Sequence, residues 1–188
     1  MSFESDRPVW ASGLVKSFGK SQAVRGVSLS VPQGSIYGVL GPNGAGKTTT
    51  LRMLLGIIDP DQGERRLLGE ANPRNVSHRV GYLPEERGLY PSMKAREAIA
   101  FMGALRGLDW AEGRRRADEA LEAAGLGYAA HGKIRKLSKG MAQLVQLLGS
   151  LIHRPELIVL DEPFSGLDPV NQELLEKLIL SERERGAT

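Results

Sequence analysis

The alternation of apolar and polar residues near the N-terminus predicts two β-strands. Residues 8–15 and 24–31 are rich in β-favouring side chains, and the second segment alternates valine and leucine with serine. The link between them, Lys16–Ser21, contains a glycine and is typical of a turn. We therefore expect an antiparallel hairpin over residues 8–31, with Gly26 marking a bulge in its second strand.

Apolar residues in the second half of the chain recur at helical spacing. From Ser92 to His153 the pattern is helical almost throughout, and Ser138 stands where it can cap the last of these helices. The three arginines at 114–116 are typical of a solvated helix face. The other predicted elements are strands at 64–68, 79–83 and 156–160 and an amphipathic helix at 171–185.

Composition limits the classes of protein to which the chain can belong. Its 188 residues, of which 41% are hydrophobic, suffice for one domain with a packed core, with or without a small insertion. The absence of cysteine excludes disulfides and cysteine metal sites. A net charge of only +3 does not imply a nucleic-acid partner. No apolar run approaches the roughly 18 residues of a membrane span.

The segment Gly41–Thr48 fits the phosphate-binding pattern G-x-x-x-x-G-K-[ST], known as the P-loop. A predicted buried strand, Ser35–Leu40, precedes it and a predicted helix, Thr49–Ile58, follows it, which is the setting that this loop requires. Glycines let successive backbone N–H groups converge on phosphate oxygens, and the helix N-terminus adds partial positive charge. The segment therefore predicts a nucleotide site rather than a plain turn before a helix. The predicted nucleotide-binding residues are Gly41, Pro42, Asn43, Gly44, Ala45, Gly46, Lys47, Thr48 and Thr49, with Lys47 on the β- and γ-phosphates and Thr48 on Mg²⁺.

Two acidic residues, Asp161 and Glu162, follow the four apolar residues at 157–160. In a P-loop site, a carboxylate at the carboxyl end of a parallel strand lies beside the phosphate loop. Asp161 would hold Mg²⁺ through water, and Glu162 would orient and deprotonate the attacking water. The alternative, a simple strand terminus, is weak once the loop is accepted as a phosphate site.

Phe18 is a lone aromatic residue in the basic, glycine-containing link of the hairpin. Two interpretations of this residue are open. Its ring either packs into the core of the hairpin or offers a flat face to an adenine ring.

Taken together and in this order, the motifs resemble the ATPase subunit of ABC transporters, and the resemblance covers nearly the whole chain. Gly41–Thr48 matches the family's Walker A motif, and Leu160–Glu162 matches Walker B with the catalytic glutamate. Ser165–Asp168 matches the D-loop. Leu137–Met141 occupies the place of the signature motif Leu-Ser-Gly-Gly-Gln, and Phe18 looks like the adenine-stacking aromatic.

The resemblance implies an α/β fold with a P-loop NTPase core and its parallel sheet, an N-terminal antiparallel β subdomain and an inserted α-helical subdomain. It assigns residues 1–84 and 154–188 to the core and β subdomain and residues 85–153 to the helical subdomain. It also implies a head-to-tail homodimer, or a pair with another ATPase subunit, in which each ATP lies between one subunit's phosphate loop and the other's signature motif. The residues that would complete the nucleotide site are Ser138, Lys139, Gly140 and Asp168.

The sequence departs from the family pattern at two motifs. Glu85 stands where the family carries a glutamine that senses Mg²⁺ and the attacking water, so we count Glu85 among the catalytic and metal-binding residues. The segment Pro84–Gly88 resembles the branch that drives exporters of sodium, drugs and similar cargo. In the signature, Lys139 and Met141 replace glycine and glutamine, and Lys139 adds a positive charge that suits a γ-phosphate.

These features predict an ATP-hydrolysing motor subunit of a transporter, an exporter, that uses ATP and Mg²⁺. It would work at the cytoplasmic face of the membrane through a separate integral permease, which would select the cargo. A soluble ABC-type ATPase of ribosomes or DNA repair is the alternative, but those usually carry two cassettes or a long coiled-coil insertion, which this chain lacks. A fragment that only binds ATP is a further alternative, although Lys47, Asp161 and Glu162 are all present.

One residue that the family leads us to expect is absent. The family places a histidine that contacts the γ-phosphate on the strand after the D-loop helix, whereas His78, His131 and His153 all precede Asp161. That strand is central in the family's sheet, and leaving its neighbours unpaired would cost about 1–3 kcal/mol for each buried backbone group. We therefore expect the 188 residues to be a piece of a longer subunit. Alone, it should hydrolyse ATP weakly and should either be unstable or bind something in the gap between the two strands. Thermal unfolding and ATPase rates of the shorter and longer chains would test this expectation.

Overall fold

The computed structural model describes residues 7–86 and 88–188. The chain divides into two compact units, Met1–Val80 with Gly186–Thr188 and Gly81–Arg185, and each is described by itself. This division groups residues 157–184 with the helical region. The assignment of residues 1–84 and 154–188 to a common core therefore stays a prediction.

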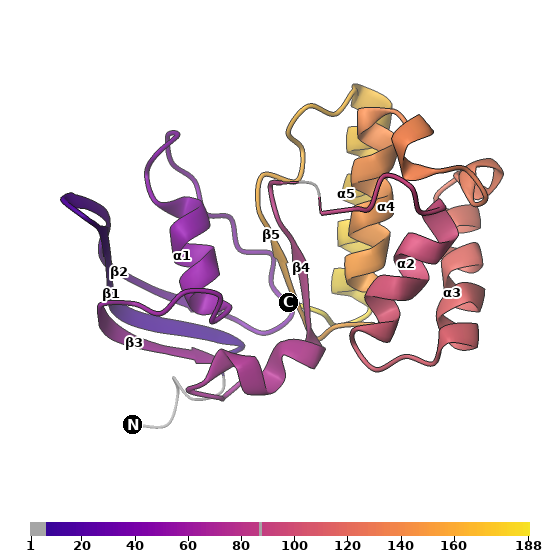
Figure 1. The fold of residues 1–188 in the computed structure, drawn as a ribbon. Coiled ribbons are helices and arrows are strands. Elements are labelled where there is room, and N and C mark those ends of the chain that lie inside the picture. Colours follow the sequence, from indigo (N-terminus) through magenta and orange to yellow (C-terminus); the bar gives the residue numbers. More distant parts are fainter. Residues whose placement is uncertain (1–6, 87) are drawn as a thin grey trace. The chain divides into compact units, whose positions relative to one another are not determined.

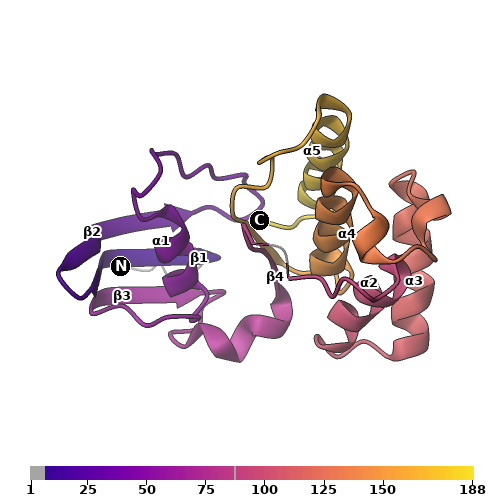
Figure 2. The same cartoon turned by 45° about the horizontal axis from the view of Figure 1, so that its top comes forward.

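The first unit is built on an antiparallel sheet of three strands in the order β2-β1-β3 (Figure 2). β1 (Val9–Phe18) and β2 (Ser21–Val31) form the predicted hairpin, and β3 (Gln62–Leu67) pairs with the other edge of β1. The turn is shorter than predicted, because Lys16, Ser17 and Phe18 pair with residues of β2 instead of belonging to the link. Gly26, with φ of 84°, lies at a shift in register and forms the predicted bulge.

Helix α1 (Lys47–Leu54) packs on β1 and β2 (Figure 1). Its residues Met53 and Leu54 are buried, and their burial against the apolar face of the sheet stabilises the unit. The helix ends before Ile58, where the sequence predicted its end. Gly56 adopts a φ of 70° and donates its N–H to the carbonyl of Met53 at 3.0 Å, which closes the last turn.

The predicted buried strand Ser35–Leu40 does not form. Within residues 7–86 and 88–188 no strand pairs with this segment, and Ile36, Tyr37 and Leu40 are 57%, 50% and 95% exposed. A strand is stabilised by its neighbour in the ladder and by burial of its side chains, so an apolar run that has neither remains irregular. The expectation of a further strand beside this segment stays a prediction.

The second unit contains a small parallel sheet and the long helices. β4 (Val80–Leu83) pairs with β5 (Leu157–Leu160), and the Asp161 N–H donates to the carbonyl of Leu83 at 2.9 Å. β5 is less buried than predicted, because only Leu157 is fully enclosed in this two-stranded sheet. Pro73–Arg79, a short 3₁₀-helix in the first unit, leads into β4. The helices are α2 (Ala95–Ala104), α3 (Trp110–Ala123), α4 (Lys139–Leu151) and α5 (Pro169–Glu184).

Helix α4 is the centre of this unit, since it packs against α2 and α3 on one side and α5 on the other (Figure 1). The predicted stripe of apolar residues is buried, but so are polar residues between them. Gln143, Gln146 and Ser150 are 4%, 2% and 3% exposed. Because helices cover both sides of α4, it has no solvated face of the kind that an amphipathic surface helix shows.

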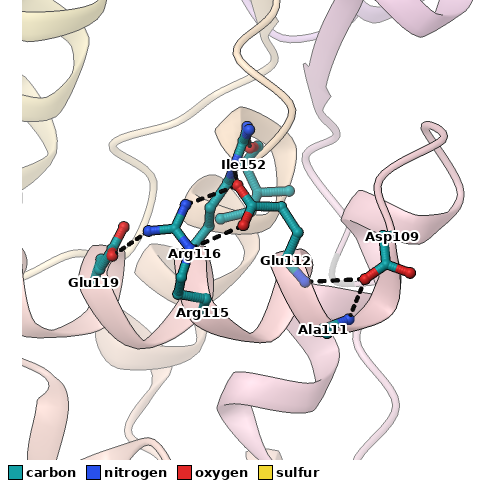
Figure 3. Close-up of polar contacts among 7 residues, drawn as sticks. All are labelled: Asp109, Ala111, Glu112, Arg115, Arg116, Glu119 and Ile152. Carbon is teal, nitrogen blue, oxygen red and sulfur yellow. Dashed lines mark hydrogen bonds and ion pairs between the residues drawn. The ribbon is translucent and has the colours of Figure 1, made fainter.

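Two of the three arginines at 114–116, Arg115 and Arg116, form hydrogen bonds and ion pairs (Figure 3). Arg116 donates to Glu112 at 2.6 Å and to the carbonyl of Ile152, at the end of α4, at 3.3 Å. Hydrogen bonds from Arg115 and then from Arg116 lower the pKa of Glu112 to about 2. The interpretation as a purely solvated face is therefore wrong for Arg116, which ties α3 to α4.

Candidate functional site

The phosphate-binding segment Gly41–Thr48 forms a loop that leads into α1. Gly44 and Gly46 have φ of 79° and 86°, and the N–H of Ala45 donates to the carbonyl of Pro42 at 3.1 Å, which makes a tight turn. Gly46 is the N-cap of α1, and no side chain caps the helix. The first turn of α1 therefore points its N–H groups and its dipole toward the loop, where a phosphate would be stabilised.

Gly46 also anchors the loop to the sheet. A Cβ at this position would lie 2.3 Å from the carbonyl oxygen of Ala23 on β2, a distance that no side chain could tolerate. Two features therefore require glycine at position 46, namely the positive φ and the close approach of the β2 backbone. The fit of the loop against β2 fixes the start of α1 relative to the hairpin.

The side chain of Lys47 spans the loop. Its Nζ donates to the carbonyl of Gly41 at 2.9 Å and lies 3.4 Å from the carbonyl of Pro42. An ammonium group held over a curved, glycine-rich backbone suits the β- and γ-phosphates of a nucleotide. Thr48, the next residue of α1, is half-buried and supplies a hydroxyl of the kind that binds Mg²⁺ in such loops.

Phe18 is the last residue of β1 and is 53% exposed, so the interpretation that it packs into the hairpin core is wrong. Its ring lies 5.9 Å from the Nζ of Lys16, which is itself held by Asp61 at 2.7 Å. The hairpin turn joins β1 to β2, and Ala23 of β2 contacts the phosphate loop. Phe18 thus offers an open aromatic face in the same unit as the loop, although its contact with a base stays a prediction.

The acidic pair lies in the second unit, at the carboxyl end of β5. Asp161 is 2% exposed, whereas Glu162 is exposed and has φ of 48°. A glutamate rarely adopts this left-handed conformation, which costs free energy and is frequent at functional sites. The N–H of Ser165 donates to the carbonyl of Glu162 at 3.0 Å, so the chain turns directly after the acidic pair.

Glu85 lies on an exposed loop two residues beyond β4. β4 and β5 run parallel, and the hydrogen bond between Asp161 and Leu83 aligns their carboxyl ends. Glu85, Asp161 and Glu162 therefore follow strands that end at the same edge of one sheet. Such an edge is where α/β proteins bind their ligands.

The signature and D-loop segments come together at the N-termini of α4 and α5. Ser138 caps α4 by accepting from the N–H of Met141 at 3.2 Å, as predicted. Asp168 caps α5 by accepting from the N–H of Asn171 at 3.0 Å and from its side-chain amide at 2.5 Å, which lowers the pKa of Asp168. A Cβ at Gly140 would lie 2.5 Å from the Asn171 amide nitrogen, so Gly140 permits this close packing.

Sequence reasoning missed two residues of this region. Asn171 joins the D-loop to the signature, and the spacing of three residues from Asp168 is a capping signal that could have identified it. The second is Gln146 of α4, which donates to the carbonyl of Glu86 at 3.3 Å. No pattern in the sequence indicates this partner.

The phosphate loop of the first unit carries donor groups that suit a nucleotide with Mg²⁺. Among the described residues no group of three or more His, Asp or Glu side chains could hold a metal ion. That finding is compatible with Mg²⁺, which is commonly held by one or two protein groups together with water and substrate phosphates. Within residues 7–86 and 88–188, the helices are too short or too polar to cross a membrane.

Comparison with known proteins places these features in a family. Residues 24–165 match the family model described as "ABC transporter". YhaQ of Bacillus subtilis, an ABC transporter ATP-binding protein, is 42% identical over 93% of this chain and 59% of its own length. The daunorubicin/doxorubicin resistance ATP-binding protein DrrA of Streptomyces peucetius is 36% identical over 100% of this chain and 58% of its own.

A solved structure shows the same fold. The ATP-binding subunit of an ABC transporter superposes with a TM-score of 0.84 at 27% identity, covering 95% of this chain and 76% of that chain. The predicted α/β fold of a P-loop NTPase is thereby confirmed. The chain spans about three-fifths of the length of the curated relatives it matches.

Proposed function

Because the chain belongs to the ABC transporter family, we propose that it is the ATP-binding and ATP-hydrolysing part of a transporter's motor subunit. ATP-binding domains of this family are ATPases in general. The observation that carries the proposal is the phosphate loop, in which Lys47 spans a glycine-rich turn at an uncapped helix N-terminus. The substrate is ATP and the products are ADP and phosphate.

In the proposed reaction, the phosphate loop binds and orients the nucleotide. Backbone N–H groups of Gly44–Thr48 and the ammonium of Lys47 would stabilise the negative charge that the phosphates carry. Thr48 and the buried carboxylate of Asp161 would hold Mg²⁺, and when bound this ion neutralises charge on the transferred phosphoryl group. Burial of Asp161 suits this role, since a buried carboxylate is stabilised by a cation.

Glu162 is the proposed general base. Its carboxylate is exposed at the end of β5, and it would accept the proton of the attacking water. Glu85, at the same sheet edge, would contact Mg²⁺ or orient that water. Ser138, Lys139, Gly140 and Asp168 would complete the site of a second subunit, as the close packing of the signature on the D-loop supports.

We further propose that the whole protein pairs head to tail with a second copy or a related ATPase subunit and drives a separate membrane permease. It would then be peripheral, at the cytoplasmic face of the membrane. Export of a small molecule is the favoured direction, since one relative is named for resistance to daunorubicin and doxorubicin. The Pro84–Gly88 segment and its resemblance to the exporter branch point the same way.

The experiment that tests this function is an ATPase assay on the full-length subunit, alone and reconstituted with its partner permease. We expect Mg²⁺-dependent phosphate release that changes when the permease is present, because a motor subunit is coupled to its transporter. ATP binding without any turnover in the complex would contradict the proposal.

Replacing Phe18 by alanine should weaken ATP binding by about 1–3 kcal/mol, roughly 5- to 150-fold, because the open ring would no longer stack on adenine. GTP affinity should fall as well, since stacking tolerates any base. Calorimetry on the full-length protein measures both affinities. Trp110→Ala, which removes an aromatic side chain that is 43% exposed at the start of α3 in the other unit, is the matched control. An unchanged affinity for Phe18→Ala would exclude stacking.

A further inference from the structure

Gln146 is a polar residue in the most buried helix of the molecule. It is 2% exposed in the middle of α4, and its side-chain Nε2 donates to the backbone carbonyl of Glu86 at 3.3 Å. The two residues are 60 positions apart in the sequence. The hydrogen bond therefore ties α4 to the loop that carries Glu85.

The other half of this amide is not satisfied. Within the described part of the chain, the Oε1 of Gln146 has no hydrogen-bond partner, although the atom is buried. A buried acceptor without a partner costs free energy, and a leucine like its neighbours Leu144 and Leu147 would avoid that cost. Stability alone therefore does not account for a glutamine at this position. The hydrogen bond to Glu86 gives the glutamine another role.

The loop after β4 borders open space. A pocket of about 270 Å³ lies beside it, lined by Pro84 and Gly88 of the loop, by apolar residues such as Phe101 and Met102 of α2, and by Gln146. Empty volume next to a loop gives the backbone room to move. The amide of Gln146 holds the loop at one defined position along this pocket.

Helix α4 also carries the signature segment at its N-terminus. Gly140, in its first turn, packs on Asn171, which is bound to Asp168. Gln146 follows six residues later, about 9 Å along the helix axis at 1.5 Å per residue. One helix therefore links the signature and D-loop to the loop of Glu85.

We propose that Gln146 is a positioning residue for Glu85. By holding the Glu86 carbonyl, it fixes the backbone from which the Glu85 carboxylate reaches Mg²⁺ or the attacking water. The inference rests on the proposed function, in which Glu85 acts in ATP hydrolysis. Residues that orient a metal-contacting group typically change metal affinity or activity by about 10- to 100-fold when replaced.

The test uses Gln146→Leu in the full-length subunit, with Gln143→Leu as the matched control. Gln143 is a buried glutamine of the same helix, one turn earlier, with no bond to the loop among the described residues. Gln146→Met, which keeps the length of the side chain, repeats the test if the leucine variant folds poorly. Backbone hydrogen–deuterium exchange over residues 84–90, without nucleotide, reports the loop directly.

We expect exchange in this loop to rise several-fold in Gln146→Leu and to stay unchanged in Gln143→Leu. In the ATPase assay, the Mg²⁺ concentration for half-maximal rate should rise by about tenfold or more in Gln146→Leu, while affinity for ATP measured without Mg²⁺ stays unchanged. Unchanged exchange, or an unchanged Mg²⁺ requirement, would overturn the positioning role. A wild-type subunit that shows no hydrolysis would instead overturn the proposed function, and the exchange data would still report on the Gln146 bond.

Discussion

Replacing Glu162 by glutamine in the full-length subunit is expected to lower ATP hydrolysis by about 10²–10⁴-fold, the range for loss of a general base, while ATP binding is retained. The amide has nearly the shape of the carboxylate but cannot accept a proton from water. Glu162 is exposed and Asp161 is buried beside it, so the substitution leaves the proposed Mg²⁺ ligand in place.

Steady-state phosphate release measures the effect of Glu162→Gln. The matched control is Glu173→Gln, an exposed glutamate of α5 that bonds to Lys177 at 2.6 Å, outside the candidate site. We expect wild-type hydrolysis from the control. Wild-type hydrolysis from Glu162→Gln would exclude Glu162 as the general base. Glu85, at the same sheet edge, would then be the next candidate.

Lys47→Ala should abolish tight binding of MgATP, with a loss of affinity of at least about 100-fold. A charge-assisted hydrogen bond to phosphate contributes roughly 1.5–3 kcal/mol, and Lys47 would make more than one. The variant also loses the bonds from Nζ to the carbonyls of Gly41 and Pro42, so the loop loses a contact that shapes it.

Calorimetric titration with MgATP measures the loss, and Lys177→Ala is the control because it removes an exposed lysine of α5. The secondary structure of Lys47→Ala should match that of wild type, since the side chain is not part of the core. Unchanged affinity would contradict the assignment of Gly41–Thr48 as a phosphate-binding loop.

The local backbone features of the candidate site were more predictable than the tertiary structure that supports them. The loop Gly41–Thr48 and the capping role of Ser138 follow from local rules, because a glycine turn and an N-cap are decided by a few neighbouring residues. The strand predicted at Ser35–Leu40 depends on a partner strand, which local sequence does not contain. An apolar run alone therefore misled the prediction.

The helical region shows the same limit. Periodicity identified the apolar residues of α4, but a glutamine reads as a surface residue until the helices on both sides of α4 are placed. For that reason the sequence did not predict the bond of Gln146 to Glu86 or the contact of Gly140 with Asn171. These contacts join segments far apart in the chain, and only the tertiary structure brings them together.

The proposed function requires this domain to pair head to tail around ATP, and a second copy is the partner that can be tested with the protein alone. Light scattering after gel filtration of the full-length Glu162→Gln variant, with and without MgATP, tests it most directly, because slow hydrolysis should trap the closed pair. The account predicts a monomer without nucleotide and a mass twice as large with MgATP. A monomeric mass at saturating MgATP would contradict it.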